Sequence, residues 1–110
     1  MVAEMEIIET PVFTEQITKL LTAEDYRAFQ VALALNPESG DLIRNSRGLR
    51  KIRWRRSGSG KSGGIRVIYY LVHREEVFLL CAYTKAKQEN LSLEQVKILA
   101  GLVKQYLEET

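Results

Sequence analysis

The chain has 110 residues, 45% of them hydrophobic and 27% charged, with a formal net charge of +2. This length and composition are typical of one globular domain and exclude a disordered chain. The net charge hides a strong segregation. Residues 42–74 hold ten of the sixteen Lys and Arg and none of the fourteen Asp and Glu, which gives +10. The six basic and fourteen acidic residues elsewhere give −8. Such sorting predicts a polyanionic partner for residues 42–74.

Several classes of protein and site are excluded by residue content. No run approaches the ~20 apolar residues of a membrane span, and the N-terminus lacks the pattern of a signal peptide. The single cysteine, Cys81, excludes an internal disulfide, and its apolar surroundings predict a buried thiol. The single histidine, His73, provides neither a zinc cluster nor a nucleophile–histidine pair. We therefore expect a cytoplasmic protein with no metal, no cofactor and no membrane contact.

The first third of the chain predicts one strand followed by two helices. Residues 6–9 are typical of a short strand. Thr14 is expected to cap a first helix, and Thr22, with an acidic residue three positions later, a second. That second helix should end at Asn36, because the residue before a proline disfavours helical backbone. The following stretch, Pro37–Asp41, predicts a turn.

The middle of the chain predicts three consecutive strands. The segments 49–55, 65–72 and 77–83 are rich in β-branched and aromatic residues, and the glycine- and serine-rich segment 56–64 suits a hairpin loop. In the first of these strands the side chains alternate between two faces, with Leu49, Lys51, Arg53 and Arg55 on one and Arg50, Ile52 and Trp54 on the other.

A final helix completes the predicted fold. Ser92 and Gln95 form a capping-box pattern before a stripe of apolar residues at helical spacing. Consecutive strands at hairpin spacing imply mainly antiparallel pairing. We therefore predict a single α+β domain over residues 1–110. Its antiparallel or mixed sheet would have about four strands, with two N-terminal helices and one C-terminal helix.

The basic cluster is the feature that carries chemistry. A solvated, soluble face is the simplest interpretation, but no acidic residue is interleaved, and like charges on adjacent strands destabilise a sheet unless something offsets them. RNA or an acidic protein would do so. Lys61 lies in a loop that ends like a P-loop, but position 55 is arginine where that motif needs glycine. The cluster comprises Arg50, Lys51, Arg53, Arg55 and Arg56, with Arg66 on the next strand.

Taken in order, several segments resemble the RelE superfamily of bacterial toxins, and its HigB-like branch in particular. They are Asn36-Pro37 with Gly40-Asp41, Gly48–Arg53, the Gly/Ser/Lys loop, Gly63–Tyr70, Tyr83–Lys85 and Asn90–Ser92. The resemblance spans nearly the whole chain. It implies a compact RelE-like fold and metal-independent, ribosome-dependent cleavage of mRNA, which inhibits translation. It also implies a cognate antitoxin of the HigA or RelB type, through which promoter DNA would be contacted only indirectly.

The resemblance also implies roles for individual residues. The family's basic–apolar–basic pattern falls on Lys51 and Arg53, its central-strand arginine on Arg66, and its basic residue after the last strand on Lys85. We expect the two arginines to stabilise the transition state, Lys51 to act as general base, and Lys85 to act as acid or phosphate clamp. The tyrosine that some members carry at the last helix has no equivalent here. The residues expected to bind RNA are Arg50, Arg55, Arg56, Lys61, Lys87 and Tyr83.

Two other functions use the same fold and charge. One is a ParE-like protein that targets DNA gyrase without cutting RNA. The other is an RNA-binding protein without catalysis. The retained basic residues favour the nuclease, because a gyrase-binding protein has no chemical need for them.

Overall fold

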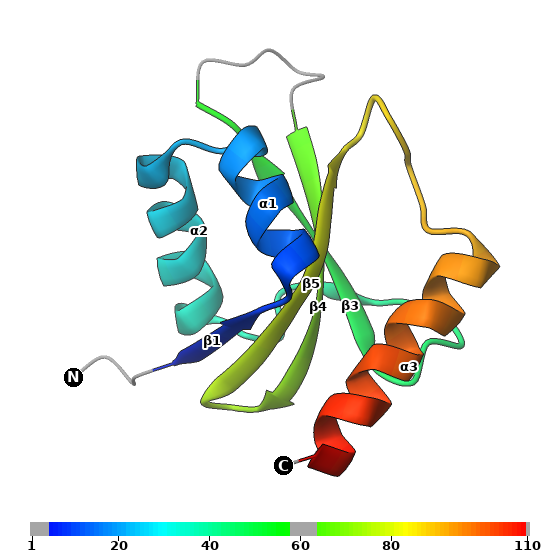
Figure 1. The fold of residues 1–110 in the computed structure, drawn as a ribbon. Helices are drawn as coiled ribbons and strands as arrows, with labels where there is room; N and C mark the ends of the chain where they lie inside the picture. The colour runs from blue at the N-terminus through cyan, green and yellow to red at the C-terminus, as the bar shows by residue number, and fades with distance from the viewer. Residues whose placement is uncertain (1–4, 58–63, 110) are drawn as a thin grey trace.

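The computed structural model describes residues 5–57 and 64–109, and within them an α+β fold confirms the predicted class. A five-stranded sheet has the order β1-β5-β4-β3-β2, with β1 parallel to β5 and the other pairs antiparallel. Helices α1 and α2 cover one face and α3 covers the other (Figure 1). The elements are β1 Glu6–Glu9, α1 Pro11–Leu20, α2 Ala23–Leu35, β2 Asp41–Leu42, β3 Leu49–Arg55, β4 Gly64–His73, β5 Glu76–Thr84 and α3 Leu93–Glu109. No helix in these residues is long and apolar enough to cross a membrane.

The start of α1 differs from the prediction that Thr14 caps it. Thr10 is the cap, and its hydroxyl accepts a hydrogen bond from the Phe13 N–H at 3.0 Å. Pro11 occupies the first turn, where its fixed φ suits a helix and its missing N–H is not needed. Thr14 lies inside the helix and donates to Glu9. The helix therefore begins earlier than the cap pattern indicated.

The second helix and its exit agree with the sequence more closely. Thr22 caps α2 by accepting from the Asp25 N–H at 3.1 Å, and Asn36 ends the helix. The predicted turn after it is held by Tyr69, whose hydroxyl accepts from the Gly40 N–H at 2.9 Å and donates to the Pro37 carbonyl at 2.7 Å. The end of this stretch forms β2, a two-residue strand that the turn composition did not predict.

Two apolar cores lie on opposite faces of the sheet. The first, under α1 and α2, contains Phe13, Phe29 and Tyr69, and the second, under α3, contains Leu49 and Val96. Adjacent residues of a strand face opposite sides of the sheet, and of tyrosines 69 and 70 it is Tyr69 that is fully buried in the first core. The predicted capping box of α3 is also confirmed. The Gln95 N–H donates to Ser92 Oγ at 3.1 Å, and the Ser92 N–H donates to Gln95 Oε1 at 2.8 Å.

An irregularity in the β4–β5 pairing sets which side chains face α3. Ile68 pairs with Cys81, but the next residue, Tyr69, pairs with Leu79, so Leu80 has no partner in the ladder. Leu80 and Cys81 both contribute to the core under α3. A β-bulge of this kind shifts the alternation of its strand by one residue. Tyr83 consequently faces α3, whereas uninterrupted alternation from Leu80 would have turned it to the other face.

Candidate active site

The basic residues predicted to be catalytic meet on the α3 face of the sheet. Arg53 of β3, Arg66 of β4 and Tyr83 of β5 are direct cross-strand neighbours and form a row across three strands, which we call the cationic row. Lys51 lies one pleat away along β3, opposite Ile68. Because side chains two residues apart share a face, Lys51 and Arg53 project to the same side. The strand register alone therefore brings three of the four residues together.

Arg66 is the central and most enclosed of these cations. Its side chain is 5% exposed, whereas Arg53 and Lys85 are exposed residues. Within residues 5–57 and 64–109, the buried Nε of Arg66 has no hydrogen-bond partner. An enclosed guanidinium with an unused donor suits an anionic ligand, because a phosphate oxygen can accept that hydrogen bond.

A cavity of about 340 Å³ opens beside Arg66 and is lined by Arg53, Trp54, Arg55, Gly64, Arg66 and Lys85. A Cβ at Gly64 would make ordinary van der Waals contact with the Trp54 carbonyl oxygen at 3.6 Å and with Nη1 of Arg66 at 3.7 Å. The Lys85 N–H donates to the Gly64 carbonyl at 3.2 Å, which holds Lys85 at the cavity directly after β5. We call this the cationic cavity. It joins Lys85 to the row and completes the predicted set of four.

The connection between β5 and α3 closes over these cations. Both carboxylate oxygens of Glu89 lie 3.5 Å from Arg66 Nη2, and Asn90 Oδ1 accepts a hydrogen bond from Lys51 Nζ at 2.7 Å. Gln88 steadies the turn by donating to the Asn90 carbonyl at 2.7 Å. Sequence reasoning missed both Glu89 and Asn90, because nothing in their local pattern connects them with strands β3 and β4. The Glu89 carboxylate and the Asn90 amide oxygen thus occupy the positions at which an anionic ligand would contact Arg66 and Lys51.

The residues predicted to bind RNA are dispersed. Arg55 lines the cationic cavity, and Arg56 is half-buried just after β3. Arg50 lies on the opposite face, where Nη1 donates to the carbonyls of Glu38 at 3.0 Å and Gly40 at 2.7 Å. Its contacts brace the turn before β2, so its position does not join it to the cationic row. Lys61 lies outside the described residues.

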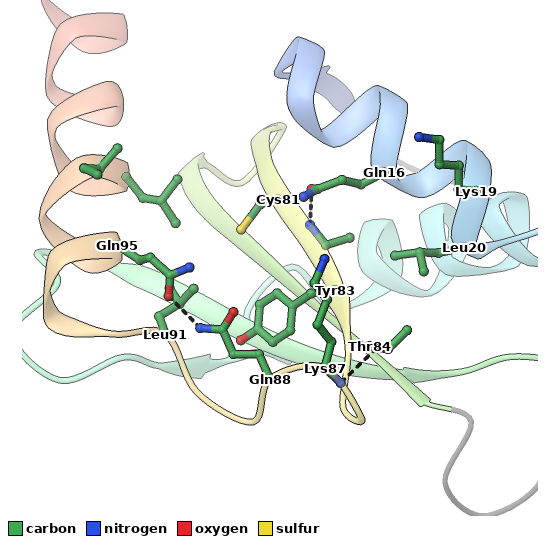
Figure 2. Close-up of a pocket in the computed structure, with 13 residues that line it drawn as sticks. Gln16, Lys19, Leu20, Cys81, Tyr83, Thr84, Lys87, Gln88, Leu91 and Gln95 are labelled. Atoms are coloured by element: carbon green, nitrogen blue, oxygen red, sulfur yellow. Dashed lines mark hydrogen bonds between the residues drawn. The ribbon is translucent and has the colours of Figure 1, made fainter.

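Tyr83 and Lys87 line a second cavity, of about 530 Å³, between α1, the end of β5 and the start of α3 (Figure 2). We call it the α1–α3 cavity. Tyr83, which the sequence predicted to bind RNA, is only 8% exposed. Cys81 also lines this cavity and is half-buried instead of enclosed. Burial raises the pKa of the Cys81 thiol to about 11.

The chemistry open to this face is that of fixed cations. The guanidinium groups of Arg53, Arg55 and Arg66 and the ammonium group of Lys85 line the cationic cavity. All have N–H donors that suit phosphoryl oxygens. Among residues 5–57 and 64–109, no group of three or more His, Cys, Asp or Glu could hold a metal ion. The cations that line the cavity support binding and charge stabilisation of a phosphodiester.

Two comparisons with known proteins bear on the family and the fold. The sequence model of the family described as "RelE toxin of RelE / RelB toxin-antitoxin system" matches residues 40–110. The fold is similar to that of the E. coli toxin RelE in the free state, in a mutant in which two arginines are replaced by alanine. In that comparison the TM-score is 0.56 and the sequence identity 18%, over 93% of this chain and 97% of the other. The matched residues contain β2 to α3 and hence every residue of the cationic row.

Proposed function

The chain belongs to the RelE toxin family, toxins of toxin–antitoxin systems, and from this premise we propose that it is an endoribonuclease that cleaves mRNA on the ribosome. The observation that carries the proposal is the gathering of Arg53, Arg66, Lys51 and Lys85 on one sheet face. Cleavage would inhibit translation until a cognate antitoxin neutralises the toxin.

The proposed reaction is attack of a ribose 2′-OH on the adjacent phosphorus, with loss of its proton and expulsion of a 5′-oxygen that gains one. The pentacoordinate transition state carries more negative charge on the phosphoryl oxygens than the ground state does. Fixed guanidinium groups therefore stabilise the transition state selectively. Arg66 suits this role best, because its side chain is enclosed and its Nε is unpartnered among the described residues. Arg53, its neighbour in the row, would assist.

The two lysines suit the proton transfers. We assign Lys51 as general base, because it lies one pleat from Arg53 on the face of the sheet that also holds Arg66. Lys85, held at the cationic cavity by its backbone bond to Gly64, would protonate the leaving oxygen or clamp the phosphate. RNA would have to displace Asn90 from Lys51 and Glu89 from Arg66. The ribosome would supply the in-line geometry that free RNA rarely adopts.

The finer assignments are part of the same proposal. We propose a HigB-like branch, an antitoxin of the HigA or RelB type, action in the cytoplasm and contact with promoter DNA only through the antitoxin. Arg55, Arg56, Lys61 and Lys87 would hold the flanking RNA backbone. Their loss should weaken binding across all sequences and reduce its salt dependence.

The test is a reconstituted translation reaction in which mRNA cleavage is mapped by primer extension. Arg66→Ala should lower the cleavage rate by about 10²–10³-fold, the typical effect of removing one transition-state donor. Arg66→Lys should retain only part of the wild-type cleavage rate, because a lysine lacks the planar guanidinium group with its paired N–H donors. Arg27→Ala, which removes an exposed arginine of α2 on the opposite side of the sheet, is the matched control. Full cleavage by folded Arg66→Ala, or inhibition of gyrase by the wild type without mRNA cleavage, would overturn the proposal.

A further inference from the structure

We propose that the α1–α3 cavity binds the nucleobase of an RNA nucleotide next to the phosphate held by Arg66. The inference deepens the proposed function and rests on it for the identity of the ligand. It concerns residues outside the cationic row, except for Tyr83, which belongs to both. Nothing in the cleavage chemistry above uses this cavity.

The size and lining of the cavity fit a flat heteroaromatic ring. A volume of about 530 Å³ lies within the ordinary range of small-molecule sites, ≈ 300–1,000 Å³. Leu20 of α1 and Leu91 lie on opposite sides of the cavity (Figure 2), and Leu99 of α3 adds to its apolar lining. Single-stranded RNA is recognised by such arrangements, in which the faces of a base pack on apolar or aromatic groups and its edge is hydrogen-bonded.

Tyr83 provides the strongest sign of a missing ligand. The residue is 8% exposed, and its hydroxyl has no hydrogen-bond partner in residues 5–57 and 64–109. A buried hydroxyl without a hydrogen-bond partner is unfavourable, so such groups normally have a function or a partner. In Figure 2 the ring points from β5 into the cavity toward Gln88. A base edge that reaches this hydroxyl would satisfy it.

Amide side chains could complete the recognition of the base edge. Gln16, Gln88 and Gln95 all line the cavity. Gln16 Oε1 accepts from the Ala82 N–H at 2.8 Å, which leaves the amide NH₂ of Gln16 as a donor. Gln88 Nε2 donates to Gln95 Oε1 at 2.6 Å, which leaves the carbonyl oxygen of Gln88 as an acceptor. Paired donors and acceptors of this kind match the edges of bases.

Continuity with the cationic row favours RNA over a peptide as the occupant. Tyr83 is the cross-strand neighbour of Arg66, so a chain whose phosphate lies at Arg66 has the cavity directly beside it. Two further cations, Lys19 and Lys87, also belong to the lining, and both are exposed residues. An apolar pocket bordered by cations and adjoining a phosphate site suits a nucleotide, whose base is uncharged and whose backbone is anionic.

The single cysteine allows a direct test that does not depend on cleavage. Cys81 lines the cavity, so a bound base should slow its alkylation by iodoacetamide. The probes are AMP, GMP, CMP and UMP, with ribose 5-phosphate as the control that has a phosphate but no base. At about five times Kd, the occupancy factor 1 + [L]/Kd predicts about sixfold slower alkylation. Leu91→Trp, which fills the cavity from one wall, should abolish the protection by nucleotides.

A second variant separates ligand binding from packing. Tyr83→Phe keeps the ring and removes the orphan hydroxyl, so it should raise the melting temperature of the free protein while weakening the protection by mononucleotides. If the hydroxyl had only a structural role, both quantities would move in the same direction.

The outcomes distinguish this inference from the proposed function. Absence of protection by every mononucleotide, with Arg66→Ala still blocking mRNA cleavage, would overturn the base site and leave the nuclease intact. Protection without any mRNA cleavage by the wild type would overturn the nuclease alone. If only the purified antitoxin protected Cys81, the cavity would be a protein-docking site and the inference would be wrong.

Discussion

Replacing Glu89 by glutamine should make the protein bind RNA more tightly while making it less stable. The carboxylate faces Arg66 at 3.5 Å in the free protein, and any RNA phosphate that reaches Arg66 has to displace it. Glu89→Gln removes that competing charge and nearly preserves the size of the side chain. The same substitution leaves an almost fully enclosed guanidinium without its counter-ion, which opposes folding.

The magnitude follows from the exposure of the two partners. Coulomb's law at an effective dielectric of 20 gives an attraction of nearly 5 kcal/mol at this separation, roughly an upper limit. The side chain of Glu89 is 49% exposed and that of Arg66 5%, so water screens one end of the pair. Exposed pairs contribute about 0.2–1 kcal/mol, and a half-enclosed pair should contribute about 1–2 kcal/mol. RNA affinity should therefore rise by about 5–30-fold, and the melting temperature should fall by roughly 5–10 °C.

The assay uses a short fluorescent RNA with 2′-O-methyl groups, which cannot be cleaved, and follows binding by anisotropy across a salt series. Thermal unfolding is followed by circular dichroism. Glu94→Gln is the matched control, because it makes the same change in net charge within the first turn of α3. Equal gains in affinity for the two variants would show that only net charge matters. Weaker binding by Glu89→Gln would show that Glu89 belongs to the RNA site and does not compete with RNA for Arg66.

Three further predictions concern stability and reactivity. Gly40→Ala should lower the free energy of unfolding by about 1–3 kcal/mol, because the new Cβ would lie 2.7 Å from the Tyr69 ring. Gly101→Ala, in open space on α3, should raise the free energy of unfolding by about 0.5–1 kcal/mol. Urea unfolding measures both, and equal effects would refute the steric account. Ser92→Ala should lower the same quantity by about 1 kcal/mol through loss of the α3 cap, and an unchanged urea midpoint would contradict that role. Burial raises the pKa of Cys81 from 9.0 to about 11. At pH 8, iodoacetamide should therefore react about 100-fold more slowly with the native protein than with the unfolded chain. Equal alkylation rates, measured by mass spectrometry, would disprove the shift.

Local patterns predicted the elements best where one residue property repeats. The alternation in residues 49–55 matched β3 at both ends, and the capping pattern at Ser92 located the start of α3. The two-residue strand β2 was not predicted, because so short a segment has no periodicity. Only its pairing with β3 defines it as a strand. At α1, the threonine pattern was ambiguous, and Pro11 decided where the helix begins.

The site was predictable only in part, because side-chain direction depends on pairing. Arg53 and Arg66 came from strands that the sequence showed plainly, and the register places them opposite each other. The direction of the Tyr83 side chain could be predicted only with knowledge of the bulge at Leu80. That bulge depends on how β4 and β5 pair, and the composition of β5 does not indicate it. The contact of Glu89 with Arg66 could be predicted only by knowing that the connection after β5 folds back over β4. No local sequence pattern indicates such a long-range contact.

The charge segregation along the sequence acquires a physical explanation from that contact. A guanidinium in the middle of a sheet is unfavourable by itself, and residues 42–74 contain no acid that could offset it. Glu89 comes from the acidic remainder of the chain and supplies the missing counter-charge at Arg66. Since this acid lies in a connection and is half exposed, its displacement requires a loop to move and leaves the sheet intact. An arginine compensated from within its own strand pair could not be uncovered so easily. Under the proposed function, the separation of charges in sequence therefore keeps the buried cation stable in the free protein and would leave it available to an RNA phosphate.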